Sequence, residues 1–282
     1  MDIFEILKAI LQGIVQGITE WLPISSTGHM ILINQFIPMH ESKAFFDLFK
    51  VLIQLGSILA VVVLYFHKLN PWGRGKTPIQ KRDTWILWSK VLVASIPAGV
   101  IGLLFDDVIE GALSRAYVIA ITLILYGVLF LLVEGRHREP KIKKLGDVSY
   151  KTALLMGVFQ MLALIPGTSR SGATIVGAIM IGCSRYVAAE FSFFMAIPAM
   201  LGASGLKTVK YVVSGDPMTA QQWVLLLVGS VVAFVVSLLV IRFLMNFIKK
   251  HNFKPFGYYR IALGVLVLIL FFAGLLPEMV VE

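Results

Sequence analysis

Six stretches of the chain are apolar over about 20 residues, the length that a membrane-spanning helix needs. We predict a transmembrane helix in each of them: residues 48–66, 87–105, 116–134, 187–206, 223–245 and 259–276. The chain is therefore expected to be an all-α polytopic membrane protein, with residues 1–282 forming a single integral membrane domain.

Two further apolar regions are interrupted before they reach spanning length. The first joins residues 3–22 to 30–37, the second joins residues 152–165 to 172–183, and prolines lie in both interruptions. Non-helical backbone at membrane depth is tolerated only where protein or a water-filled cavity surrounds it. We therefore predict two re-entrant helical hairpins, and we expect a functional site at their breaks.

The distribution of positive charge predicts the orientation. Lysine and arginine are concentrated in the loops 67–85, 135–151 and 246–258. Because basic loops stay in the cytoplasm, six spans place both termini outside. The first hairpin then enters the membrane from the outer face and the second from the inner face.

A weak internal repeat has the same layout. Residues of the first hairpin and of the span that follows it recur in the same order in the second half: Gly13, Gln16, Pro23, Ser26 and Asp47 recur as Gly157, Gln160, Pro166, Ser169 and Glu190. We expect residues 1–146 and 147–282 to form an inverted-topology repeat, the arrangement in which sites form near mid-membrane where broken helices meet.

Composition excludes a soluble globule and a disulfide framework. The chain is 58% hydrophobic and 15% charged, with a mean hydropathy of +0.85, whereas about a quarter of the residues of a soluble domain are charged. Cys183 is the one cysteine, so a cysteine-based metal site is also excluded. The net charge of +9 is explained by the cytoplasmic loops, and we expect no nucleic-acid partner. The sequence leaves a homodimer open.

The first break combines an acid, a base and hydroxyl groups. Gln16 and Glu20 share a helix face, Pro23 ends that helix, and the next one is capped by hydroxyl residues: Ser25, Ser26 and Thr27. A helix N-terminus of this kind binds anions. His29 follows Ser26 by three positions, which predicts that both project to the same side. The hydroxyls could serve as caps only, but ionisable residues such as Glu20 and His29 are functional by default inside a membrane.

The second break has the same pattern and adds a cation. Pro166 and Gly167 stop the helix, and hydroxyl residues surround Arg170 at the start of the next one: Ser169, Ser171 and Thr174. The planar guanidinium of arginine pairs with phosphate oxygens, which favours an anion clamp. The alternative is a structural ion pair of Arg170 with Glu20 or Glu190. Glu20 and His29 have no counterparts in the second break, so the two breaks differ in chemistry.

At these breaks the sequence resembles the undecaprenyl-diphosphate phosphatase family, also called the bacitracin-resistance family. The motifs that match are Gln16 with Glu20, the stretch from Ser25 to His29, and the stretch from Pro166 to Thr174. The resemblance implies hydrolysis of undecaprenyl diphosphate at the outer face of a bacterial cell membrane, which recycles the lipid carrier for wall synthesis and confers bacitracin resistance. It also implies dependence on a divalent cation, Mg²⁺ or Ca²⁺. Some members carry Glu at the position of Gln16, so less charge is available here for a metal.

These residues fit that chemistry in two ways. In the first, Arg170 and the helix N-termini hold the diphosphate, Ser26 is the nucleophile, His29 is its base or acid, and Glu20 orients them or holds the metal. Contacts to the substrate would come from the remaining polar residues of the breaks: Gln16, Ser25, Thr27, Ser169, Ser171 and Thr174. In the second, His29 or Glu20 activates water and Ser26 binds phosphate. A rival function is a secondary transporter or lipid-phosphate flippase with an anion site at the broken helices.

Overall fold

The computed structural model describes residues 2–136, 139–213 and 217–276. This part of the chain is helical and contains no sheet. The α-helices are α1 (Ile3–Thr19), α2 (Ser26–Phe36), α3 (Lys43–Leu64), α4 (Phe66–Leu69), α5 (Pro78–Leu113), α6 (Ala116–Gly135), α7 (Tyr150–Met161), α8 (Arg170–Ile181), α9 (Arg185–Val213), α10 (Ala220–Lys250) and α11 (Lys254–Phe272). Two short 3₁₀ turns are η1 (Leu145–Asp147) and η2 (Leu162–Leu164).

The six predicted spans are confirmed, because α3, α5, α6, α9, α10 and α11 are each long and apolar enough to cross a membrane. Their ends differ from the prediction. Helix α5 begins well before residue 87 and continues past residue 105, and α9 likewise runs beyond both ends of the predicted 187–206. Hydropathy marks only the part of a helix that lies in lipid, and a helix continues into water where no residue breaks it.

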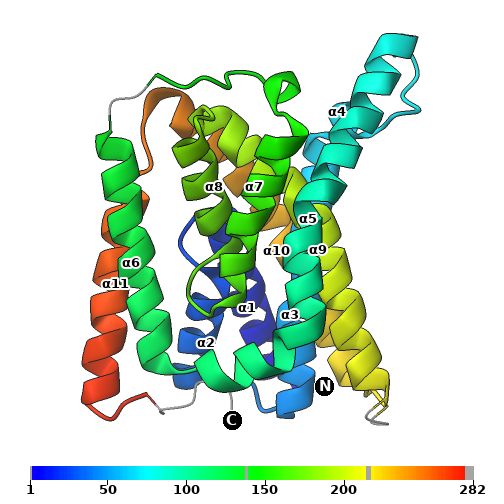
Figure 1. Cartoon of the computed structure of the whole chain (residues 1–282). Helices are drawn as coiled ribbons and strands as arrows, with labels where there is room; N and C mark the ends of the chain where they lie inside the picture. Colours follow the sequence, from blue (N-terminus) through cyan, green and yellow to red (C-terminus); the bar gives the residue numbers. More distant parts are fainter. Residues whose placement is uncertain (1, 137–138, 214–216, 277–282) are drawn as a thin grey trace.

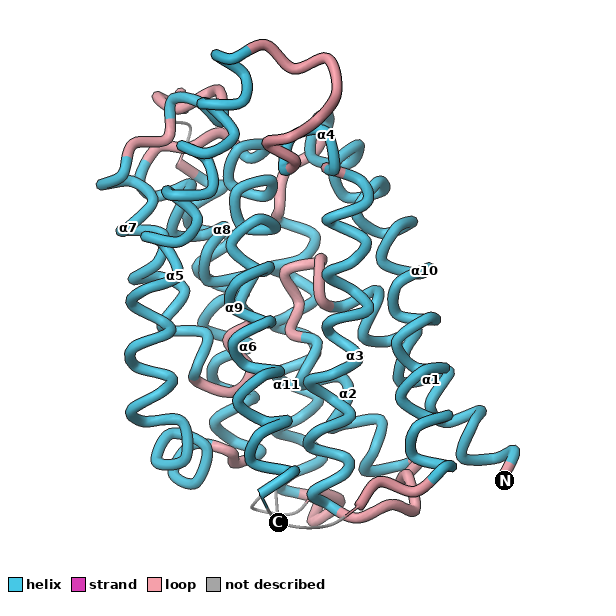
Figure 2. Tube along the Cα trace, turned by 90° about the vertical axis from the view of Figure 1, so that its right-hand side faces the viewer, coloured by secondary structure: helices cyan, strands magenta, loops and turns pink. Residues whose placement is uncertain are grey.

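The two broken helices enter the bundle from opposite ends (Figure 1). The α1–α2 pair lies at the end where α1 begins and α11 finishes, whereas α7 and α8 lie towards the end that carries α4 and the basic loops. Figure 2 shows the same long axis from the side. The pairs have the shape that the predicted re-entrant hairpins need, while their relation to the bilayer and the division into halves 1–146 and 147–282 stay predictions.

Close glycine contacts hold the broken helices against the spans. A Cβ at Gly13 of α1 would lie 2.7 Å from the carbonyl oxygen of Gly229 in α10, and one at Gly17 would lie 2.7 Å from Val236 of the same helix. On α7, Gly157 packs equally closely on the backbone of Ala94 in α5. Small residues allow such approach between membrane helices. The first helix of each pair is therefore fixed to a span from the other half of the chain.

Candidate active site

The helix that follows each break begins with an N-cap residue of the same backbone conformation. The N-cap residues Ser25 of α2 and Ser169 of α8 have positive φ angles of 77° and 70°, which residues other than glycine rarely adopt. Each hydroxyl accepts a hydrogen bond from the backbone N–H three residues on, that of Gly28 at 3.4 Å and that of Gly172 at 3.2 Å. Strained backbone of this kind is concentrated at functional sites.

These caps change the alignment of the two breaks. The predicted repeat matches Ser169 with Ser26, but by backbone conformation Ser169 corresponds to Ser25. The first residues of the two helices, Ser26 in α2 and Arg170 in α8, then occupy equivalent positions. The predicted nucleophile and the predicted anion clamp are therefore placed by the same local fold.

Glu20 joins the two breaks. Its carboxylate is 5% exposed and accepts three hydrogen bonds: from Ser26 Oγ at 2.7 Å, from Gln16 Nε2 at 3.1 Å and from Arg170 Nη2 at 3.3 Å. The Ser26 and Gln16 donors share Oε2, and the Arg170 guanidinium takes Oε1. A carboxylate bonded to a serine hydroxyl can accept its proton.

Arg170 is held in place by more than this ion pair. Its Nη1 donates to the carbonyl oxygen of Ser192 at 2.7 Å, and its guanidinium lies 5.9 Å from the ring centre of Trp21. Its Nε is buried without a hydrogen-bond partner in the described structure. The structural ion pair with Glu20 that the sequence left open is thus present. A buried donor without a partner needs an explanation, so the ion pair does not account for the whole guanidinium.

The other predicted binding residues divide into two groups. Ser25, Thr27 and Ser169 line a cavity between the breaks, together with Ser26, Arg170 and Glu20. By contrast Gln16, Ser171 and Thr174 do not line it and bond within the protein: Gln16 to Glu20, Ser171 to the carbonyl oxygen of Glu20 at 3.1 Å, and Thr174 to the hydroxyl of Ser192 at 2.5 Å. The bond of Ser171 joins the second break to the first, that of Gln16 lies within the first break, and that of Thr174 joins α8 to α9. Direct contact with a ligand stays an untested prediction for all three.

His29 does not share the side of Ser26, contrary to the expectation from helical spacing. Its Nδ1 donates to the carbonyl oxygen of Ser25 at 2.6 Å, and its Nε2 lies 2.7 Å from the hydroxyl of Tyr259 in α11. The two rings stack, and His29 does not line the cavity. The partner on α11 determines this orientation, which the sequence of α2 alone does not encode.

Sequence reasoning missed Arg260, which lies at the centre of the two breaks. The residue comes from α11, has 0% exposure, and donates to the carbonyl oxygens of Pro23 at 3.0 Å and of Gly167 and Thr168 at 2.9 Å. It therefore links the first break to the second through backbone atoms. The sequence does contain a sign of its importance, because Arg260 is a charged residue within an apolar span. Burying a charge in the membrane costs free energy, so such residues usually have a structural or functional role.

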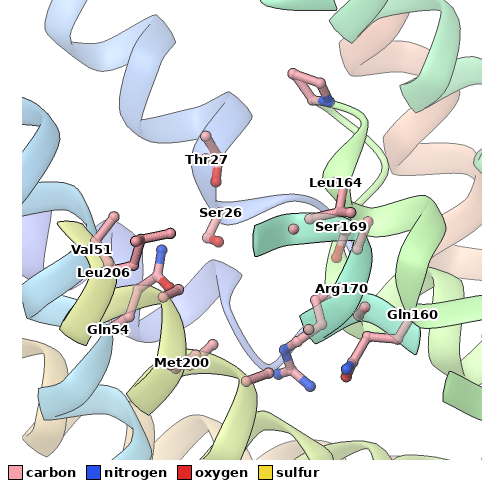
Figure 3. A pocket seen from close by; sticks show the side chains of 18 of the residues that line it. Ser26, Thr27, Val51, Gln54, Gln160, Leu164, Ser169, Arg170, Met200 and Leu206 are labelled. Atoms are coloured by element: carbon pink, nitrogen blue, oxygen red, sulfur yellow. The ribbon is translucent and has the colours of Figure 1, made fainter. Parts of the chain in front are cut away.

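The cavity has a volume of about 650 Å³, within the range of small-molecule sites. Figure 3 shows Ser26 and Thr27 on one side of it, with Arg170 and Gln160 on another. Gln160 is 3% exposed and both polar atoms of its amide lack a hydrogen-bond partner in the described structure. A buried amide without partners needs an explanation, and a polar ligand in this cavity supplies one.

The described residues do not contain a cluster of three or more His, Cys, Asp or Glu side chains that could hold a metal ion. One carboxylate is nevertheless compatible with Mg²⁺, which is bound through one or two carboxylates together with substrate phosphates and water. Gln16 Oε1, a buried oxygen without a hydrogen-bond partner among the described residues, lies beside Glu20 but does not line the cavity. Of the two, Glu20 is therefore the oxygen ligand available to a cation that is shared with a bound phosphate.

Comparisons with known proteins agree with one another. Residues 9–266 match the family model described as bacitracin resistance protein BacA. The chain is 58% identical to undecaprenyl-diphosphatase 1 of Clostridioides difficile, over 96% of this chain and 98% of the relative. It is 56% identical to undecaprenyl-diphosphatase of Lactiplantibacillus plantarum (94% and 97%) and 55% identical to that of Enterococcus faecalis (93% and 95%). The chain belongs to the bacitracin resistance protein family.

Proposed function

We propose that this protein hydrolyses undecaprenyl diphosphate to undecaprenyl phosphate and inorganic phosphate. The reaction recycles the lipid carrier of bacterial cell-wall synthesis and confers resistance to bacitracin. Relatives that cover nearly the whole chain are undecaprenyl-diphosphatases. The observation that carries the proposal is the carboxylate of Glu20, bonded to both Ser26 and Arg170 at the wall of one cavity.

Arg170 has the chemistry to bind the terminal phosphoryl group. Phosphoryl transfer depends mainly on positioning and on charge stabilisation at the non-bridging oxygens. The guanidinium, its unused Nε donor and the N-terminus of α8 supply positive charge there. The unpartnered Gln160 amide adds a neutral donor on the same side of the cavity.

Ser26 is the nucleophile in this proposal, with Glu20 as its base. Ser26 Oγ attacks the terminal phosphorus, its proton passes to Glu20, and the bond from phosphorus to the bridging oxygen breaks with undecaprenyl phosphate as the leaving group. Water then attacks the phosphoserine, the bond from phosphorus to Ser26 Oγ breaks, and Ser26 Oγ takes back the proton that Glu20 holds. The oxygen and both protons of the water leave with the inorganic phosphate. The 2.7 Å bond from Ser26 to Glu20 favours this carboxylate over His29 as the base.

A divalent cation, Mg²⁺ or Ca²⁺, would be held by Glu20, which lines the cavity, together with the substrate's phosphates. It would neutralise charge on the diphosphate. Chelation should stop phosphate release and added cation should restore it. Undiminished release after chelation would refute this part of the proposal.

We also propose that the site faces the outer side of the plasma membrane. The basic loops lie at the end of the bundle that carries α4, which the positive-inside bias places in the cytoplasm. The start of α1 and the end of α11 then lie outside. Ser114, which lies in the connection between α5 and α6, also lines the cavity, so the cavity extends towards the outer end. Pairing as a homodimer and the lack of a nucleic-acid partner stay predictions.

The test is phosphate release from undecaprenyl diphosphate by purified protein in detergent. Ser26→Ala should abolish turnover. Ser57→Ala is the matched control, because Ser57 is a buried serine that does not line the cavity and whose hydroxyl has no partner among the described residues. No release by the folded wild-type protein would refute the phosphatase proposal, and undiminished release by Ser26→Ala would refute Ser26 as the nucleophile.

A further inference from the structure

The glycines of the membrane helices have two kinds of surroundings. At Gly13, Gly127 and Gly264 an added Cβ would lie 2.6 to 2.8 Å from atoms of a neighbouring helix, so these glycines allow close packing. At Gly99 of α5 and Gly202 of α9 an added Cβ would meet no atom of the described residues within 4 Å. Glycine weakens a helix relative to alanine, so a glycine that nothing packs against needs another reason.

Both of these glycines line the cavity that contains Ser26 and Arg170. Gly102 of α5 lines it too, and an added Cβ there would reach only the end of Leu164, at 3.7 Å. We call Gly99, Gly102 and Gly202 the glycine slot. At Gly205 of α9 an added Cβ would likewise meet no atom of the described residues within 4 Å, but Gly205 does not line the cavity.

A proline precedes the slot on each side. Pro97 lies inside α5 and Pro198 lies inside α9, and prolines inside helices kink them. Pro198 also lines the cavity. Hydrogen atoms in place of side chains on both helices leave a passage from the cavity that larger residues would fill.

The passage opens towards lipid. Ile96 and Leu103 of α5 line the cavity and are also 55% and 71% exposed. Both belong to the part of α5 that is apolar enough to span the membrane, Pro78–Phe105. An apolar opening at this depth admits a hydrocarbon chain from the bilayer without exposing it to water.

We propose that the glycine slot binds the first isoprene units of the substrate while the diphosphate lies at Ser26 and Arg170. The inference rests on the proposed function and assigns the lipid part of the same site. An isoprenoid chain carries a methyl branch in every unit and is wider than a straight acyl chain, so a wall without side chains accommodates it. The polar wall of the cavity then binds the diphosphate, and the slot binds the part of the apolar chain that adjoins it.

The test places a leucine in the slot. Gly99→Leu and Gly202→Leu should both fold, because an added Cβ at either site meets no atom and leucine favours the helix. Gly205→Leu is the matched control on α9 outside the cavity. With undecaprenyl diphosphate, the slot variants should lose about tenfold or more in kcat/KM, with the control within about twofold of wild type. With methyl diphosphate, which carries no isoprene unit and cannot reach the slot, all three should stay close to wild type.

The slot is refuted if Gly99→Leu and Gly202→Leu match wild type on the long substrate. An equal loss on both substrates also contradicts it, because the leucines would then obstruct the phosphate site. Binding of undecaprenyl phosphate, followed by thermophoresis, separates the slot from the reaction. If wild type releases no phosphate but the slot variants alone lose lipid binding, the phosphatase proposal fails and the slot stands.

Discussion

Replacing Arg260 with lysine should separate the two breaks while leaving a positive charge in the core. Arg260 Nη1 donates to Pro23 in the first break, and Nη2 donates to Gly167 and Thr168 in the second, all at 2.9 to 3.0 Å. A lysine carries its donors on one nitrogen and cannot occupy both positions of the guanidinium. At least one break therefore loses its link to α11.

The size of the effect follows from the lost bond. A hydrogen bond from a charged donor contributes about 1.5–3 kcal/mol. If this free energy is what keeps Glu20 and Ser26 aligned with Arg170, kcat/KM falls about tenfold to hundredfold, since 1.36 kcal/mol corresponds to a factor of ten. Thermal unfolding should also begin at a lower temperature.

The assay is phosphate release from undecaprenyl diphosphate, with thermal unfolding measured on the same preparations. Arg82→Lys is the control, because Arg82 is exposed near the start of α5. Wild-type kcat/KM and wild-type melting in Arg260→Lys would refute the view that Arg260 sets the geometry of the site. A lower melting temperature with unchanged kcat/KM would limit Arg260 to the stability of the fold.

Gln160→Met should lower kcat/KM for undecaprenyl diphosphate about tenfold, because it removes a hydrogen-bond donor at the phosphate. Gln12→Met is the control at a buried glutamine outside the cavity and should leave kcat/KM unchanged. Equal losses in the two variants would contradict the role of Gln160. Lys68→Ala should destabilise the protein by about 3–5 kcal/mol because it leaves the buried Glu190 unpaired, and Glu190→Gln should cost less because Lys68 is half exposed; urea denaturation checks the order. Burial raises the pKa of the Cys183 thiol to about 11, so its alkylation in folded protein should stay slow below that pH, and fast labelling at neutral pH would show that the thiol is accessible.

The sequence predicts the spans and the positions of the breaks because both depend on local properties. Twenty apolar residues cross a membrane wherever they occur, and proline followed by hydroxyl residues ends one helix and caps another. The ion pair between Glu20 and Arg170 could also be predicted as one alternative. Acidic and basic side chains are both unfavourable in lipid unless they pair with one another.

The remaining features depend on contacts between distant segments. His29 turns to Tyr259, 230 residues away, and helical periodicity within α2 says nothing about that partner. Arg260 bonds to carbonyl oxygens that are free only because both breaks have folded. The equivalence of Ser25 with Ser169 depends on a positive φ, which residue types do not reveal.

The central claim is that the two breaks form one active site in which Ser26 carries the phosphoryl group. It is tested by acid-quenching the wild-type enzyme during turnover of undecaprenyl diphosphate labelled in its terminal phosphate, and by locating the label on peptides. We predict label on Ser26 in the wild type and none in Arg170→Gln, because Arg170 of the second break holds the group that Ser26 of the first break attacks. Phosphate release without label on Ser26, or wild-type labelling in Arg170→Gln, would contradict the account.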